Sequence, residues 1–134
     1  MYNKTTGEKV STIKTEKVYE TTDNYLFFKR DEKTICFDLK TWEEKWESEE
    51  MIKLTLHEDN IYGYLAEWCK DDDNKNRHFI VVNLEDGKII WEDRQNIFVE
   101  PTFGNTPLIT DDYVVTITDR YGPDPLLWVY ERVK

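Results

Sequence analysis

Two short stretches of this chain decide its fold, because each repeats the other. Residues 37–47 read FDLKTWEEKWE, and residues 82–92 read VNLEDGKIIWE. In both, an apolar run ends at an aspartate or asparagine, a polar turn follows, and a tryptophan comes a few residues later. Trp46 and Trp91 are 45 positions apart, and residues 3–10, NKTTGEKV, form a fainter third copy. Self-similarity at this period predicts a repeat architecture.

The rest of the chain supplies the strands of such units. Runs of β-branched and aromatic residues are cut by polar turns, which is typical of an antiparallel meander. The turns Asp23-Asn24, Asp59-Asn60 and Asp111-Asp112 align with one another, and each precedes an apolar second strand. We therefore predict an all-β protein of about three four-stranded antiparallel propeller-like blades in one repeat domain. Its parts are an orphan outer strand at 3–15, blades at 18–48 and 51–93, and an incomplete blade at 97–134.

One segment also fits a helix. Residues 41–54 place Trp42 and Trp46 four positions apart, and Thr41 with Glu44 forms a capping-box pattern. Taken alone, the segment is as compatible with a helix as with a strand. Its alignment with residues 86–91 favours a strand.

The repeated pattern resembles the blades of quinoprotein-type (PQQ-like) β-propellers. In those blades the third strand ends in an aspartate, a Thr-Gly turn follows, and the fourth strand carries a tryptophan. Residues 83–91 match this pattern best, while residues 37–46 have Trp42 in place of the turn glycine. Residues 3–10 keep the Thr6-Gly7 turn but are followed by Ser11 where the tryptophan would stand.

The resemblance implies a structural role for tryptophan. A ring on the outer strand of one blade covers the seam with the next and buries roughly 150–250 Å². We expect Trp46, Trp91 and Trp128 to dock blades in this way. PQQ binding needs many inserted side chains in a large closed ring, and no residue of this chain maps to them, so no cofactor is expected.

The number of blades raises the question of closure. Closed propellers usually have about four to eight blades. The third unit has no fourth strand, and residues 3–15 form a fourth strand without a unit. Two chains that exchange these ends would form a homodimer with six blades and twofold symmetry. An open array of three sheets, or a fragment of a larger propeller, is the alternative.

The charge balance bears on the kind of partner. The chain has 28 acidic and 18 basic residues, a formal net charge of −10, and 14% aromatic residues. Disordered acidic chains are poor in aromatic residues, so the acidity belongs to a folded surface. Such a surface argues against a nucleic acid or an anionic membrane as the main partner. It suits a basic protein partner, although high net charge also serves solubility.

Two features point to the compartment. Cys36 and Cys69 lie in apolar runs without a metal-binding or C-x-x-C spacing, which indicates buried free thiols in a reducing environment. Residues 1–9 lack the apolar stretch of a secretory signal. We therefore expect a cytoplasmic protein.

Candidate chemical sites are sparse, and no catalytic constellation stands out. His57 and His78 have no partner at a recognised metal or triad spacing, so we expect both at the surface or at strand ends. Residues 71–76 resemble a calcium loop. However, Arg77 stands where the loop glycine belongs, and the twelfth position lacks glutamate. A solvated hairpin tip fits better, and we expect no metal site. The candidate partner-binding residues are Tyr121, on a proline-braced tip, and Asp71, Asp72 and Asp73.

These observations favour a non-catalytic protein–protein interaction module on a propeller-like scaffold. A small acidic immunity or inhibitor protein that neutralises a basic toxin or nuclease is a specific form of this hypothesis. The alternatives are a small-molecule binder or enzyme whose site forms only in the assembled ring, and a purely structural array of blades.

Overall fold

A computed structural model describes residues 5–6, 12–67, 76–99, 106–118 and 126–132. All regular structure in these ranges is β-strand, which confirms the predicted all-β class. No helix long and apolar enough to cross a membrane is present among the described residues.

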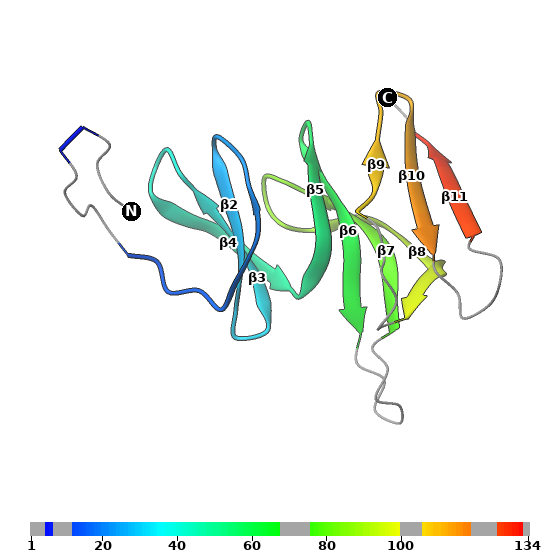
Figure 1. The fold of residues 1–134 in the computed structure, drawn as a ribbon, viewed down its shortest axis with the longest axis horizontal. Helices are drawn as coiled ribbons and strands as arrows, with labels where there is room; N and C mark the ends of the chain where they lie inside the picture. Colours follow the sequence, from blue (N-terminus) through cyan, green and yellow to red (C-terminus); the bar gives the residue numbers. More distant parts are fainter. Residues whose placement is uncertain (1–4, 7–11, 68–75, 100–105, 119–125, 133–134) are drawn as a thin grey trace.

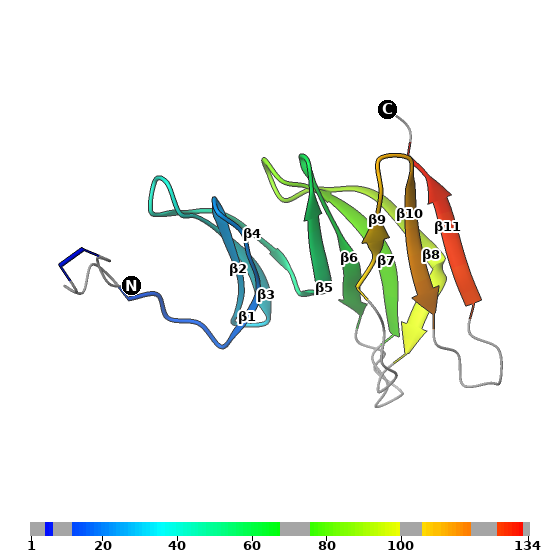
Figure 2. The same cartoon turned by 45° about the horizontal axis from the view of Figure 1, so that its top comes forward.

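The strands form three antiparallel sheets, none of them closed into a barrel. They stand side by side in chain order, as Figures 1 and 2 show. The first sheet contains β1 (Lys17–Thr21), β2 (Tyr25–Arg30), β3 (Lys33–Asp38) and β4 (Glu43–Glu49). The second contains β5 (Met51–His57), β6 (Asn60–Glu67), β7 (Asn76–Asn83) and β8 (Ile89–Val99). The third contains β9 (Leu108–Ile109), β10 (Tyr113–Thr118) and β11 (Leu126–Glu131).

Local turn geometry sets the pairing inside each sheet. Asp31 and Glu32 join β2 to β3 with φ angles of 51° and 58°. Positive φ at both central residues is the conformation that a two-residue hairpin needs, because it matches the right-handed twist of the strands. The resulting register pairs Phe27 with Cys36 and Phe28 with Ile35. Neighbouring residues then face opposite sides of the sheet.

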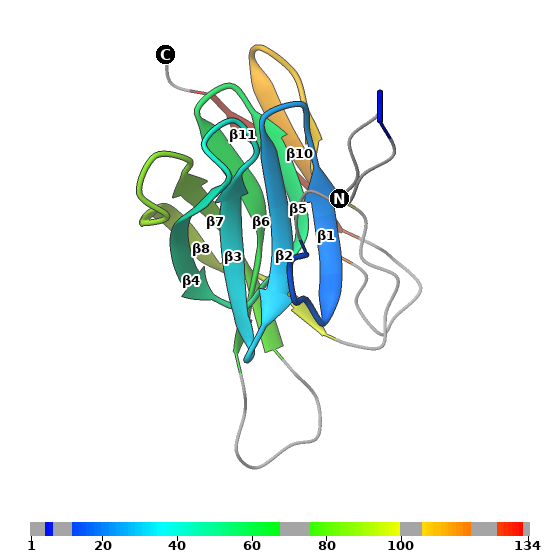
Figure 3. The same ribbon diagram turned by 90° about the vertical axis from the view of Figure 1, so that its left-hand side faces the viewer.

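The sheets pack face to face through these alternating side chains. Phe27 and Cys36 of the first sheet join a buried cluster with Met51, Leu54 and Ile80 of the second. The opposite face of the second sheet packs on the third, which completes a stack of three layers. Figure 3, viewed along the stack, shows the first sheet in front of the other two.

The outer face of the first sheet has its own apolar cluster. Phe28, Ile35 and Phe37 are buried there, and Ile13 and Trp42 pack against them. Residues 12–15 form no strand in the structure, although they belong to the expected outer strand at 3–15.

The 45-residue repeat is visible in the hydrogen bonds of the turns. The Asp38 side chain accepts a hydrogen bond from the Lys40 amide at 2.8 Å, and the Asn83 side chain accepts one from the Glu85 amide at 2.7 Å. Two further bonds close the turns at 2.9 Å, from the Trp42 amide to the Asp38 carbonyl and from the Gly87 amide to the Asn83 carbonyl. Trp42 and Gly87 both have positive φ, 61° and 73°. The indole therefore stands at a position where glycine is the usual residue.

A second set of bonds carries the repeat into the third sheet. The amides of Leu39, Leu84 and Arg132 donate to the carbonyls of Asn24, Asp59 and Asp112. This corrects the aligned turns by one residue, because Asp59, and not Asn60, is equivalent to Asn24. The β5–β6 turn is a tight two-residue loop, with Glu58 at a φ of 54°, so the second strand begins one residue earlier there.

Other expectations can be compared directly with the strands. Residues 43–49 and 51–57 are strands, so the strand prediction for residues 41–54 is confirmed and the helical alternative is wrong. The strand β8 continues to Val99 through two irregularities in its register with β7. Ile97 therefore pairs with His78 in the second sheet instead of opening the third unit.

Candidate interaction site at the third sheet

Trp46 shows how a tryptophan of the repeat is sealed. Its indole nitrogen donates to the Leu84 carbonyl of the second sheet at 2.7 Å. A Cβ atom added to Gly87 would lie 2.6 Å from the Trp46 ring, so the ring fills the space that a side chain would need. The ring also lies 6.2 Å from that of Phe27. The turn between β7 and β8 thus covers the indole.

Trp91, the equivalent residue of the second sheet, has no such cover. Its ring makes edge contacts with Phe79 and Tyr130, at centroid distances of 5.9 and 5.2 Å. The side chain is nevertheless 44% exposed. Within the described ranges, its indole N–H donates no hydrogen bond, in contrast to that of Trp46. Trp91 therefore contacts the third sheet on one side and solvent on the other.

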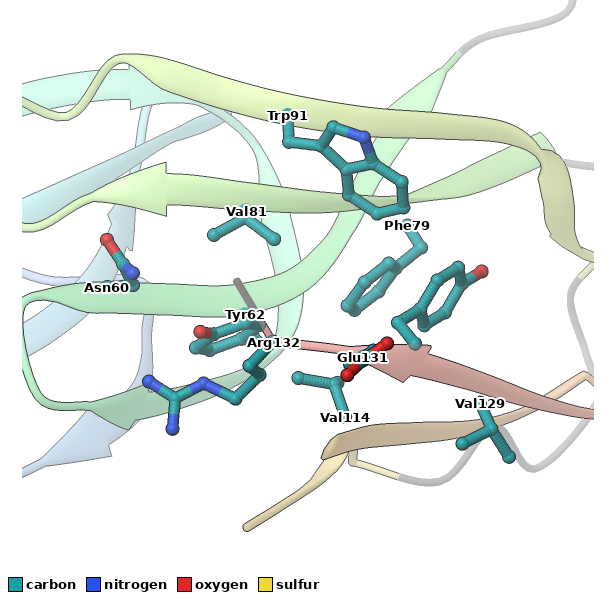
Figure 4. Close-up of a pocket in the computed structure, with 10 residues that line it drawn as sticks. Asn60, Tyr62, Phe79, Val81, Trp91, Val114, Val129, Glu131 and Arg132 are labelled. Atoms are coloured by element: carbon teal, nitrogen blue, oxygen red, sulfur yellow. The ribbon is translucent and has the colours of Figure 1, made fainter. Parts of the chain in front are cut away.

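A groove opens beside this ring, between the second and third sheets. Its volume is about 570 Å³, within the range of ligand and side-chain pockets. Figure 4 shows the rings of Trp91 and Phe79 turned toward each other at one end, with Tyr62 and Arg132 at the other. The rings of Phe79 and Tyr130 stack at 5.2 Å. The lining residues are Asn60, Tyr62, Phe79, Val81, Trp91, Val114, Val129, Tyr130, Glu131 and Arg132.

Two carboxylates border the aromatic floor. The Tyr130 hydroxyl donates to Asp93 at 2.8 Å, and Glu131 is exposed at the rim. On the opposite face of the second sheet, Nε2 of His78 lies 2.9 Å from Glu92. His78 is only 3% exposed, so its expected place at the surface or at a strand end is wrong. The bulge in β8 brings Glu92 within reach of it.

Arg132 fastens the third sheet to the second. Its guanidinium donates to Glu58 at 3.1 Å and to the Thr110 carbonyl at 3.0 Å, and it lies 3.0 Å from Nε2 of His57. Burial lowers the pKa of Arg132, but hydrogen bonds with Glu58 and Tyr62 outweigh that effect and raise the pKa above its usual value. Arg132 occupies the position of Leu39 and Leu84 in the repeat.

The same contacts bear on a metal site. Ligand atoms of His57, Glu58 and Asp111 lie within 4.8 Å of one another. The Arg132 guanidinium, already positive, contacts His57 and Glu58. It therefore occupies the position that a cation would need, and the cluster is a contact between two hairpin tips.

Among the described residues, no strand covers one edge and one face of the third sheet. The strands β3 and β7 each pair with a fourth strand, but among the described residues no strand pairs with the outer edge of β11. The face turned away from the second sheet carries Leu108, Val115 and Val129 in one cross-strand row. Leu108, Leu127 and Val129 are 64%, 62% and 56% exposed. Side chains of this kind are normally covered when they cluster.

The residues singled out from the sequence fall into two groups. Trp46 and Trp91 lie at the two contacts between sheets, and Trp128 is half-buried in β11 opposite Thr116. Tyr121, Asp71, Asp72, Asp73 and Cys69 lie outside the described residues. Cys36 is a buried free thiol, as expected. Burial raises its pKa to about 12.

Sequence reasoning missed three residues of the groove. The sequence places Phe79 and Tyr130 in strands without indicating a groove, and Arg132 belongs to no motif that the sequence reveals. In the repeat, Tyr130 is equivalent to Phe37 and Val82. This equivalence is the signal that could have placed Tyr130 at the contact between the second and third sheets. Neither a protein-family model nor a curated protein matches this chain, so its own geometry carries the functional argument.

Proposed function

We propose that this chain is a non-catalytic protein-interaction module that takes an extended strand of another polypeptide along β11. The contrast between the two equivalent tryptophans carries the proposal. Trp46 is covered by the β7–β8 turn, whereas Trp91 is 44% exposed beside an edge of β11 with which no described strand pairs. A bound strand would pair with the open edge of β11 as β8 pairs with β7, and would so become the fourth strand of the third sheet.

The energetics of such binding follow from the surface. Backbone hydrogen bonds along an unpaired edge give affinity, and pockets for alternate side chains give specificity. The groove offers such a pocket, with Trp91 and Tyr130 as aromatic anchors. Truncation of a central aromatic anchor typically costs about 2 kcal/mol or more of binding free energy.

The charge of the site favours a basic partner. Asp93 and Glu131 border the groove, and the whole chain has a net charge of −10. A cationic strand would gain from this field, and a cationic side chain over Trp91 would gain from the ring as well. We also propose that the stacked sheets are blades of a propeller-type assembly, which the face-to-face packing and the repeated turns support.

A peptide titration tests the proposal. The probe is a synthetic peptide with the sequence of residues 83–93, the fourth-strand segment of the second sheet. A second peptide carries lysine in place of Glu85 and Glu92. We expect calorimetry to show binding of both, tighter for the lysine peptide. We expect NMR to show shifts at the Trp91 indole N–H and at the β11 amides.

Substitutions then locate the binding site. Trp91→Ala should weaken binding at least about tenfold, because it removes the anchor. Ile90→Ala is the matched control, since Ile90 is the adjacent exposed residue of the same strand, with 54% of its surface accessible. A folded monomeric chain that binds neither peptide, or one that binds them without change at β11, would disprove the proposal.

A further inference from the structure

The chain itself contains a segment that could cover Trp91. We infer that residues 3–12 of a second copy of this chain form the strand that pairs with β11, an inference that rests on the proposed function. Residues 3–10 repeat the turn and strand start of residues 83–90, with Asn3 in the place of Asn83 and Gly7 in the place of Gly87. No further segment of the sequence repeats both residues at this spacing.

Gly7 is the residue that this position requires. Gly87 adopts a φ of 73°, and a Cβ atom there would lie 2.6 Å from the Trp46 ring. A turn that covers a tryptophan in this repeat therefore needs glycine, which has no side chain, at the residue above the indole. Residues 3–12 bring glycine to that place over Trp91, four residues after Asn3, as Gly87 comes four residues after Asn83.

The position of the N-terminal segment points to a second copy. Residues 12–16 lead into β1 on the outer side of the first sheet, where Ile13 packs and the Glu16 amide donates to Lys29. The third sheet lies at the opposite end of the stack, with the second sheet between, as Figures 1 and 2 both show. A strand from the same chain would have to pass two sheets to reach β11.

The faces next to this strand also fit. Within one chain β4 leads directly into β5, and the second sheet then covers a face of the first. In the same way, residues 3–12 lead into β1 of their own copy. The first sheet of that copy would then cover Leu127 and Val129, which are 62% and 56% exposed. Reciprocal exchange gives a twofold symmetric dimer in which both copies bury this face.

Charge complementarity supports the same occupant. Residues 3–12 contain two lysines and one glutamate, a net charge of +1 in a chain whose total is −10. The groove is bordered by the carboxylates of Asp93 and Glu131. The N-terminal segment is thus a basic strand opposite an acidic site, and the association should weaken as salt rises.

Light scattering on the full 134-residue chain tests the inference. We expect a mass of twice 16.2 kDa, together with dissociation on dilution. Gly7→Val should raise the dimer dissociation constant at least about tenfold, since a side chain would collide with Trp91. Thr6→Val, the same side chain one residue earlier in the turn, should leave the dimer intact. Trp91→Ala should weaken it as well.

A mixing experiment tests the exchange itself. A Gly7→Val chain keeps an intact β11 site, and a Trp91→Ala chain keeps an intact N-terminal strand. Mixed, they can form one fully native contact, so the mixed dimer should be tighter than either variant alone. Additive weakening without such recovery would contradict exchanged strands.

The outcomes separate this inference from the proposed function. A monomeric wild-type chain that binds the 83–93 peptide would overturn the second copy as occupant and keep the strand-binding module. A monomer that binds no peptide would overturn both. A dimer unaffected by Gly7→Val would overturn the inference, and circular dichroism on each variant shows that the fold is retained.

Discussion

At the level of single residues, Trp46 differs from Trp91 in two contacts. Its indole N–H donates to the Leu84 carbonyl, and its ring lies against Gly87 of the β7–β8 turn. Trp46→Phe keeps the ring but removes the donor to the Leu84 carbonyl. We expect it to lower the free energy of unfolding by about 1–3 kcal/mol, because a carbonyl at the sheet contact loses its partner. Urea unfolding measures this. Trp91→Phe is the matched control and should cost much less; equal effects would contradict a role for the bond.

Gly87 supports a second prediction at this scale. Gly87→Ala introduces left-handed strain of about 1–2 kcal/mol. It also places a methyl group against the Trp46 ring, which adds overpacking of about 1–3 kcal/mol. The free energy of unfolding should fall by roughly the sum. Lys88→Ala, at an exposed residue of the same turn, should change it little. A stable Gly87→Ala chain would show that the contact with Trp46 is loose.

The contribution of Asp38 to the stability of the fold depends on pH. Hydrogen bonds from the Thr41 and Lys40 amides lower the pKa of its carboxyl group below the usual value. The contribution to stability is therefore complete above the unfolded pKa of about 3.9, and it is lost as the pH falls through the lower folded pKa. Asp38→Asn copies the neutral Asn83 of the second unit. The wild type should be the more stable chain at neutral pH, and the difference should shrink below pH 4 in thermal melts.

At the level of elements, Arg132 holds the third sheet in place. Its contacts with Glu58 and the Thr110 carbonyl join the second and third sheets at their hairpin tips. We expect Arg132→Met to let β9, β10 and β11 open more often, seen as a severalfold loss of amide protection in hydrogen exchange. Arg30→Met removes an ion pair with Glu44 inside the first sheet and should leave the third sheet unchanged. Uniform loss of protection would contradict a local role for Arg132.

The elements also show where sequence reasoning ends. Turn residues such as Asp38 and Asn83 predict the turns, because their side chains bond their own backbone. The bulges that extend β8 to Val99 have no comparable signal. The one-residue difference at Asp59 depends on a tight loop that the sequence alone does not reveal. Arg132 stands at a position that holds leucine in the other two units, so the repeat pattern does not predict a contact of an arginine there.

At the level of the whole molecule, Cys36 reports on the contact between the first two sheets. It is fully buried there, and burial raises the pKa of its thiol to about 12. Because the thiolate is the reactive form, alkylation of Cys36 at pH 8 should follow unfolding of the molecule. Peptide mapping by mass spectrometry gives the rate at this cysteine alone. Rapid labelling without denaturant would mean that the first sheet separates from the second.

Trp42 has a consequence for how copies of this chain can combine. Its indole already fills the bare turn position of the first unit and lies 5.1 Å from Phe37, edge to face. A copy that offered this turn to Trp91 would force two indoles into a space shaped for one. The N-terminal segment, in contrast, has Ser11 where the repeat has tryptophan, so Trp42 meets no rival ring on its own side. In the proposed exchanged dimer, this difference in side-chain size would favour contacts in which the first sheet of one copy follows the third sheet of the other, and would disfavour other orders of sheets.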